Sequence, residues 1–280
     1  MIFFPCNFNK IEIVERVIEG QTVSIKYESK KSADVNKLVT KISYVQSTAA
    51  KYYVKAKALF LQEMYREAIP HFLSCIMIER QNIKAYLELA EAYRCLDEFE
   101  KSVDVLERAK AIAPENPQVY LYLGMSYNLA QVHSLAIENL QKSINLDSNN
   151  PNAKLQLAIA HELCEEYEMA LKIYESIIDV HQDFIPALQN EAALLLELNM
   201  FNEAAGCFYR ILKINPDFYR AYLGIGICFD NLQMYNKALR YYRKFLQKKP
   251  KSKTAPDIMS RIAKIKNAMQ SKPTSHIALC

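Results

Sequence analysis

Residues 117–150 read PQVYLYLGMSYNLAQVHSLAIENLQKSINLDSNN, and most of the chain repeats the plan of this stretch. Four side chains of its first half stand at i, i+3, i+4 and i+7: Tyr120, Leu123, Gly124 and Tyr127. This spacing places them on one face of a helix. In the second half Ala136 and Leu140 stand four residues apart, which is typical of a second helix. The stretch therefore predicts an antiparallel helix pair.

The pair formed by Ala136 and Leu140 returns every 34 residues, so that six copies run without a gap from Ala49 to Ser252. The other five pairs are Ala68 and Phe72, Ser102 and Leu106, Ala170 and Tyr174, Ala204 and Phe208, and Ala238 and Tyr242. The small residue of each pair lets a neighbouring helix approach closely. One helix pair cannot bury its apolar face alone, so we expect the copies to stack on one another.

The pattern resembles the tetratricopeptide repeat, whose period is 34 and whose signature is W-x2-L-G-x2-Y, then A-x3-F, then P. The copies span 49–82, 83–116, 117–150, 151–184, 185–218 and 219–252. The closing proline occurs as Pro114, Pro216 and Pro250, and tyrosine replaces the tryptophan in four copies. The resemblance implies an all-α fold, a right-handed α-solenoid of stacked antiparallel helix pairs with terminal capping helices.

The segments outside the repeats are predicted to form the two ends of the array. Within 1–48, alternating apolar residues around Glu19 to Thr22 predict a short hairpin, and a stripe from Val35 to Val45 predicts a helix that packs on the first repeat. Within 253–270, Pro256 and a stripe of four apolar residues predict a C-terminal capping helix; these are Ile258, Ile262, Ile265 and Met269. Residues 271–280 show no periodicity and are predicted to be a disordered tail.

Composition and charge bound the class of protein. The repeats predict one elongated domain, and seven cysteines without paired spacing fit a reducing cytoplasm. We find neither a basic leader nor an apolar run long enough to cross a membrane. Charge is distributed unevenly: 1–82 carries +4, 83–218 carries −11 and 219–280 carries +11. This asymmetry leaves open a homo-oligomer in which the basic end of one copy meets the acidic middle of another.

The resemblance also implies where a partner would bind. Members of this family hold ligands against a groove formed by the first helices, and the matching positions here are Tyr53, Lys57, Leu87, Glu91, Arg94, Leu121, Met125, Asn128, Leu155, Ile159, Glu162, Gln189 and Leu223. The third and fourth copies place apolar residues at positions where exposure would favour polar ones, and such a strip usually marks a contact surface. We expect a peptide or helix to bind there. The alternative is that the N-terminal segment or a second copy covers the strip.

Two more specific functions concern the first-helix positions and the basic end of the chain. Family members that clamp chaperone tails need Lys and Asn where Tyr53 and Lys57 stand, so this function is not expected. The basic end comprises Lys237, Arg240, Arg243, Lys244, Lys248, Lys249, Lys251 and Lys253. Its aromatic neighbours Tyr242 and Phe245 hold core positions, which favours a solvated end. An anionic partner remains the alternative: an acidic protein, a nucleic acid or a membrane surface.

No arrangement of side chains favours catalysis or a metal. His161, Cys164 and Glu165 have a spacing that can converge on a metal, but His161 holds an inward position of the repeat and is read as a core residue. Gly226 lies inside a helix as a packing residue rather than in a phosphate loop. We therefore predict a non-catalytic, cytoplasmic scaffold or adaptor without cofactor or metal, and as an alternative a self-assembling structural factor.

Overall fold

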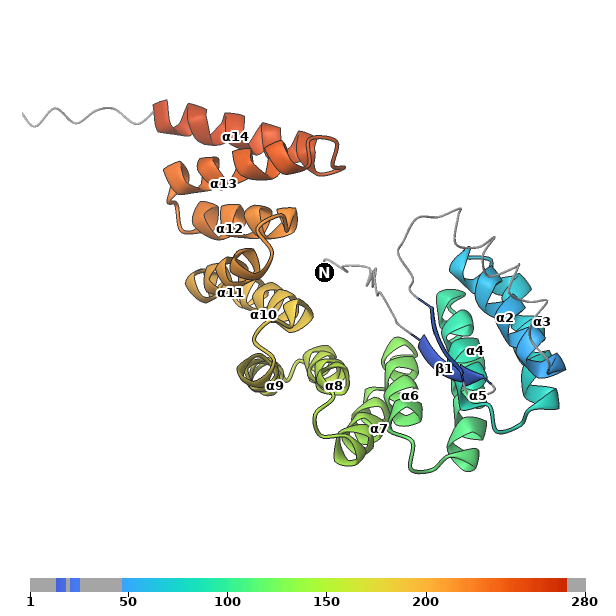
Figure 1. The fold of residues 1–280 in the computed structure, drawn as a ribbon. Coiled ribbons are helices and arrows are strands. Elements are labelled where there is room, and N and C mark those ends of the chain that lie inside the picture. The colour runs from blue at the N-terminus through green and yellow to red at the C-terminus, as the bar shows by residue number, and fades with distance from the viewer. Residues whose placement is uncertain (1–13, 19–20, 26–46, 271–280) are drawn as a thin grey trace, which may run out of the picture. The chain divides into compact units, whose positions relative to one another are not determined.

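The computed structural model describes residues 14–18, 21–25 and 47–270. In the last of these ranges the chain forms helices that follow one another in antiparallel pairs (Figure 1). Their bounds are α2 Thr48–Leu61, α3 Tyr65–Ile78, α4 Ile83–Cys95, α5 Phe99–Ile112, α6 Pro117–Leu129, α7 His133–Leu146, α8 Pro151–Leu163, α9 Tyr167–Val180, α10 Ile185–Glu197, α11 Phe201–Ile214, α12 Tyr219–Asn231, α13 Tyr235–Lys248 and α14 Ala255–Gln270. Each 34-residue copy holds one pair, so the predicted solenoid of helix pairs is confirmed.

Residues 14–18 and 21–25 form a hairpin. Strand β1 (Val14–Ile18) pairs antiparallel with β2 (Gln21–Ile25), and the register sets Val14 opposite Ile25. The strands lie in the segment where alternating residues predict a hairpin. The helix expected from Val35 to Val45 and the tail 271–280 lie outside the described residues.

The chain separates into two compact units, Met1–Ala130 and Gln131–Cys280, rather than forming the single elongated domain that the repeats predict. Each unit has its own cluster of buried apolar side chains, one between Ala49 and Leu123 and the other between Leu155 and Ile265. The physical reason is that a helix pair in a repeat array packs on its neighbours only, so no common core is required.

The turn inside each pair repeats as strictly as the sequence. Six residues spaced 34 apart have a left-handed backbone with φ between 56° and 64°: Glu63, Asp97, Gln131, Glu165, Asn199 and Gln233. At the end of α2 the N–H of Met64 donates to the carbonyl of Leu59 at 3.0 Å and the N–H of Glu63 to that of Phe60 at 2.9 Å. These bonds satisfy carbonyls that the helix end would leave open. They also turn the chain into the second helix.

Asparagine side chains cap the starts of three first helices. Asn82, Asn116 and Asn150 stand 34 residues apart and begin α4, α6 and α8. Each side-chain oxygen accepts a backbone N–H of the first turn, such as that of Gln118 at 2.9 Å from Asn116. Two tyrosines that replace the family's tryptophan bond to the closing proline, since Tyr120 and Tyr222 donate to the carbonyls of Pro114 and Pro216. At the boundary between the second and third copies both contacts are present, the Asn116 cap and the Tyr120 bond.

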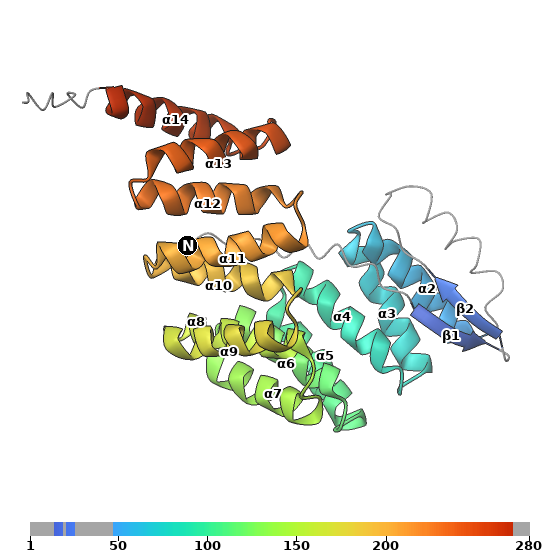
Figure 2. The ribbon, with the colours of Figure 1, turned by 60° about the vertical axis from the view of Figure 1, so that its left-hand side comes forward.

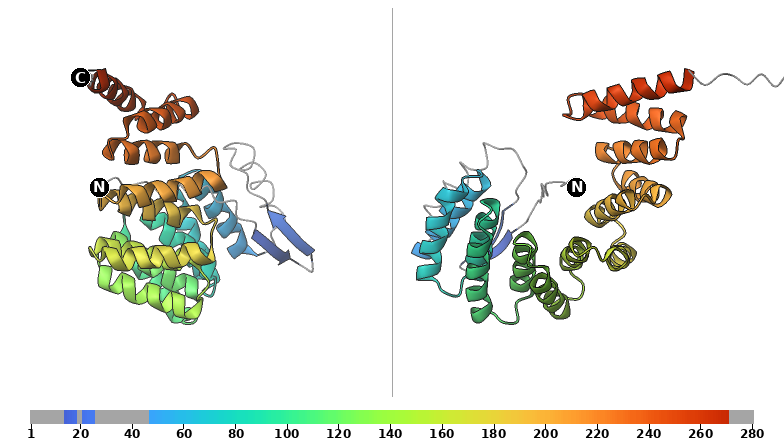
Figure 3. Two further views of the ribbon diagram at one scale, coloured as in Figure 1. Left: turned by 90° about the vertical axis from the view of Figure 1, so that its left-hand side faces the viewer. Right: turned by 180° about the vertical axis from the view of Figure 1, so that it is seen from behind.

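Packing inside each unit is continuous from pair to pair. In the first unit α4 contacts α2 and α6, and in the second α8 contacts α10. Helices α10 to α14 follow one another as layers of the second unit, as seen from two directions in Figures 1 and 2 and from behind in Figure 3. Tyr242 and Phe245 are buried, as their core positions predict. No described helix is both long and apolar enough to span a lipid bilayer.

The C-terminal helix α14 packs on α13. Of its predicted apolar stripe, Ile265 is buried and Ile258 and Ile262 are half-buried, whereas Met269 is exposed. The stripe thus ends at Ile265, because the last turn of α14 extends past the residues that cover it.

Replacing glycines by alanine tests how closely these helices approach each other. A Cβ added to Gly226 would lie 2.5 Å from Cδ1 of Tyr242, whereas a Cβ on Gly206 would meet nothing within 4 Å. We expect Gly226→Ala to lower the free energy of unfolding by about 1–3 kcal/mol through overpacking. Gly206→Ala is expected to raise it by about 0.5–1 kcal/mol through helix propensity alone. Urea unfolding of both variants checks this, and equal effects would contradict the close contact.

Candidate functional site

The first-helix face is the set of side chains at positions 5, 9 and 12 of the first helices, counted from the start of each copy. The sequence pattern predicts that the leucines of this face are exposed. The structure buries three of them: Leu87, Leu121 and Leu155 keep only 5%, 7% and 3% of their accessible surface. The physical reason is that consecutive first helices contact each other and cover the apolar side chains between them. These leucines belong to the core, and their exposure was wrongly predicted.

The other predicted residues of this face lie at intermediate depth. Asn128 is buried, and the rest are half-buried: Tyr53, Lys57, Glu91, Arg94, Met125, Ile159, Glu162, Gln189 and Leu223. Half-buried side chains on packed helices are held in place while part of their surface faces outward. Such positions can contact a partner without unfolding the helices that carry them.

In the first unit the face carries a network that joins α2 to α4. Tyr53 Oη and Lys57 Nζ both donate to Oε1 of Glu88, at 2.9 and 2.7 Å. Lys57 also lies 5.6 Å from the ring centroid of Phe60. Glu88 stands one position beyond the residues that the family pattern names, so it was missed. The lysine is thus already paired within the chain.

Arg94 on α4 is an enclosed cation, with 8% of its side chain exposed. Its Nη2 donates to Glu91 on the same helix, and its guanidinium lies 5.5 Å from the ring centroid of Tyr122 on α6. Nε and Nη1 find no hydrogen-bond acceptor among the described residues. Because these atoms are buried, an incoming anion would have to displace neighbouring side chains to reach them.

In the second unit the face carries carboxylates held by tyrosines. Tyr174 Oη on α9 donates to Oε2 of Glu162 on α8 at 3.0 Å. Burial raises the pKa of Glu162 above its usual value, and the nearby carboxylate of Glu197 raises it further, while the Tyr174 hydrogen bond lowers it. A comparison of the copies could have revealed the pairing of Glu162 with Tyr174. Only the fourth and sixth copies combine an acid at position 12 with a tyrosine at position 24.

The sixth copy repeats the arrangement with one addition. Tyr242 Oη donates to Oδ2 of Asp230 at 2.9 Å. Arg261 on α14 donates from Nε to Oδ2 and from Nη2 to Oδ1, both at 2.7 Å. This is a two-pronged guanidinium–carboxylate pair, which is stronger than a single neutral hydrogen bond. It fastens the capping helix to α12.

Another buried acid, Glu191, lies on α10 outside the first-helix face. Cys207 Sγ donates to Oε2 of Glu191 at 3.1 Å, and both side chains are buried. Burial raises the pKa of Glu191, while the Cys207 hydrogen bond lowers it. Burial also raises the pKa of Cys207, so the thiol stays protonated and unreactive at neutral pH. We assign this pair to the core.

The basic end lies on α13 and the turn that follows it. Seven of its eight cations are exposed and Lys244 is half-buried. Three of them lie over aromatic rings of the sixth copy, with Lys237 Nζ 5.0 Å from the ring centroid of Phe229. Lys248 pairs with Asp217, which raises the lysine pKa. The aromatic neighbours thus serve packing and cation–π contacts within the chain.

His161 is half-buried, rather than enclosed in the core as its repeat position predicts. Its Nδ1 lies 2.5 Å from Oε2 of the exposed Glu166, beyond the turn that ends α8. The neighbouring Cys164 is the C-cap of α8. The side chain therefore serves as a link across the turn.

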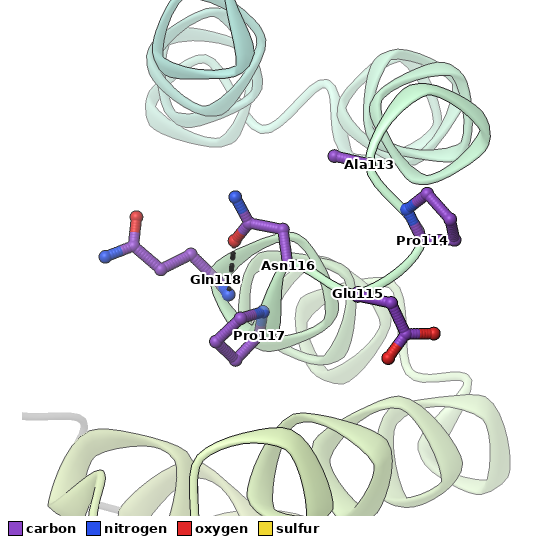
Figure 4. A pocket seen from close by; sticks show the side chains of 6 residues that line it. All are labelled: Ala113, Pro114, Glu115, Asn116, Pro117 and Gln118. Carbon is purple, nitrogen blue, oxygen red and sulfur yellow. Dashed lines mark hydrogen bonds between the residues drawn. The ribbon is translucent and has the colours of Figure 1, made fainter.

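A shallow pocket occupies the turn between α5 and α6 (Figure 4). It is lined by Ala113, Pro114, Glu115, Asn116, Pro117 and Gln118. The side chains of Glu115 and Gln118 point away from each other, and the dashed line marks the capping bond from Gln118 to Asn116. The pocket contains none of the predicted site residues, and Asn116 in its lining caps α6.

Comparisons with known proteins bear on this architecture. A family model described as tetratricopeptide repeat matches residues 59–123, and a second model of that description matches residues 220–252. No curated protein matches the chain in sequence.

Solved structures share the fold at low sequence identity. The pilus biogenesis factor PilW is 15% identical with a TM-score of 0.67, over 77% of this chain and 100% of that one. The Cut9–Hcn1 assembly of the APC/C is 16% identical with a TM-score of 0.65, over 83% of this chain and 47% of that one. YrrB, a TPR protein described as having an unusual peptide-binding site, is 17% identical with a TM-score of 0.51, over 68% and 97%.

The pair of Arg261 and Asp230 predicts a measurable contribution to stability. Arg261→Gln removes the two-pronged contact and leaves a buried carboxylate with only its tyrosine. We expect the free energy of unfolding to fall by about 1–3 kcal/mol and amide exchange in α14 to accelerate. Lys264→Gln, at an exposed position of the same helix, is the control. If both variants behave alike, the pair does not hold α14.

The raised pKa of Glu191 predicts a dependence of stability on pH. Because the folded state holds this proton more tightly than the unfolded state, the stabilisation is complete below the unfolded pKa and is lost as pH rises through the folded pKa. Glu191→Gln removes that loss, so the variant should gain stability over wild type as pH rises from 4 to 7. Urea unfolding at several pH values measures it. Glu138→Gln, exposed on α7, should keep the wild-type profile.

Proposed function

We propose that this chain, which belongs to the tetratricopeptide repeat family, is a non-catalytic adaptor that holds a peptide or helix of a partner protein on its first-helix face. The tetratricopeptide fold supports a protein–protein interaction scaffold in general, and proteins of this kind are mostly non-catalytic. The peptide-binding site in the description of YrrB concerns that protein, and it makes a peptide a reasonable class of ligand for this one.

One observation carries the proposal. In the second unit the first helices present half-buried apolar side chains beside hydrogen-bonding groups: Ile159, Glu162, Gln189, Leu223 and Ile227. The same helices bury their remaining apolar residues in the core, with Leu155 and Leu188 as examples. A partner would therefore meet a surface that is rigid and part apolar, with polar groups to fix its orientation. Rigid helices reduce the entropy lost when a partner binds.

This face differs from the one that sequence reasoning emphasised. Leu121 and Leu155 are core residues, so replacing them would test the stability of the fold rather than partner binding. Ile159 and Leu223 are half-buried and can be changed with less damage. The contact surface that we propose is thus narrower than the predicted groove. It lies within the second unit.

The test compares partner capture by three proteins. Wild type, a variant carrying Ile159→Gln and Leu223→Gln, and the control Met169→Gln are used as bait, and circular dichroism verifies that each folds. Met169 is an exposed apolar residue on the second helix α9. We expect partners retained by wild type and the control to fall at least tenfold with the face variant. Partners retained equally by all three would overturn the proposal.

A further inference from the structure

Two copies of one repeat position provide an internal comparison. In the sixth copy the carboxylate of Asp230 receives a hydroxyl from Tyr242 of its own pair and the guanidinium of Arg261 from the next helix. Asp230 and Arg261 are 31 residues apart, which joins position 12 of one helix to position 9 of the next. The structure thus shows how a guanidinium binds a carboxylate on this face through two hydrogen bonds.

The fourth copy also has a carboxylate and a tyrosine at these positions, a glutamate in place of the aspartate, but no described cation pairs with it. Glu162 and Tyr174 stand 68 residues before Asp230 and Tyr242, and their oxygen atoms are 3.0 Å apart. The residue 31 positions after Glu162 is Ala193, which has no charge and is too short to reach the carboxylate. No described lysine or arginine pairs with Glu162, and Glu197 adds a second negative charge nearby.

We propose that Glu162 binds an arginine side chain of a partner protein, with the guanidinium taking the place beside α8 and α10 that Arg261 takes beside α12. The inference rests on the proposed function, since it assigns one residue class to the segment that the face would hold. Arginine suits this place better than lysine because its planar fork matches a carboxylate with two bonds.

The surroundings of Glu162 favour a positively charged segment. Residues 151–197 carry nine acidic and two basic side chains, so the field around the face attracts cations. Ile159 is half-buried three residues before Glu162 and would contact the aliphatic stem of an arginine. Gln189 and Ala193 lie on the facing helix α10, and Ala193, at the position equivalent to Arg261, has no side chain beyond its Cβ. The occupant is therefore an arginine flanked by uncharged or basic residues.

The first experiment needs no partner. Ala193→Arg places a guanidinium at the position of Arg261, and we expect it to raise Tm by about 2–4 °C by pairing with Glu162. Ala193→Gln has a similar reach without charge and should give no rise. The rise should vanish when Ala193→Arg is combined with Glu162→Gln. A rise that survives this combination, or no rise at all, would overturn the assigned geometry.

The second experiment measures the ligand class on the full chain. The probe is N-acetyl-arginine N-methylamide, and its citrulline counterpart keeps the shape without the charge. We expect saturable NMR shifts of the Glu162 and Ala193 amides with the arginine probe, and binding at least tenfold weaker with citrulline. Glu162→Gln should abolish the shifts, whereas Glu138→Gln should retain them. Equal binding of both probes, or binding unaffected by Glu162→Gln, sinks the inference.

The outcomes separate this inference from the proposed function. If captured partners depend on Ile159 and Leu223 while the arginine probe ignores Glu162, the face binds partners and only the arginine assignment fails. If the probe needs Glu162 but no partner depends on the face, the proposed function fails. Sedimentation at low and high salt tests whether a second copy of this chain supplies the arginine. Self-association that Glu162→Gln abolishes would show that the arginine comes from a second copy, which also overturns the assignment to another protein.

Discussion

The structure depends on one constraint: a helix pair buries its apolar face only against the next pair. The two helices of each pair must therefore be joined in the same way in every copy. The residue with left-handed backbone in the turn between them makes this possible. Asp97 and Asn199 hold this conformation with φ of 59° and 60° although neither is glycine. Left-handed backbone costs a non-glycine residue energy, and the capping bonds and neighbouring helices offset the cost. This turn recurs with the 34-residue period of the sequence.

The repeat explains why so much of the fold can be predicted from the sequence. Pairs such as Ala136 and Leu140 mark the core because every copy solves the same packing problem. The same reasoning misplaced Leu87, since the family frame assigns position 5 to a groove without saying how closely consecutive first helices lie. That distance depends on the side chains of both helices. The presence of a helix pair in each copy therefore follows from periodicity, whereas exposure at a shared boundary does not.

The side-chain pairs of the face were less predictable for a related reason. The bonds from Tyr53 and Lys57 to Glu88 join residues 35 and 31 apart, and no single copy contains both partners. A pattern read within one repeat misses contacts between repeats. Comparing equivalent positions across copies finds some of them, as with the acid and tyrosine of the fourth and sixth copies. Arg261 was hidden because it lies beyond the last recognisable repeat.

Packing alone does not account for a charge at Glu162. Leu196 fills the equivalent position in the fifth copy, so the stacking of helix pairs accepts an apolar residue there. The buried hydroxyl of Tyr174 needs an acceptor, but a neutral amide would serve it at a smaller desolvation cost than a carboxylate. In the sixth copy Arg261 compensates the charge of Asp230, and its bonds fasten a helix. Glu162 accepts a bond from Tyr174 but pairs with no described cation, so a guanidinium from outside would offset the desolvation of its carboxylate.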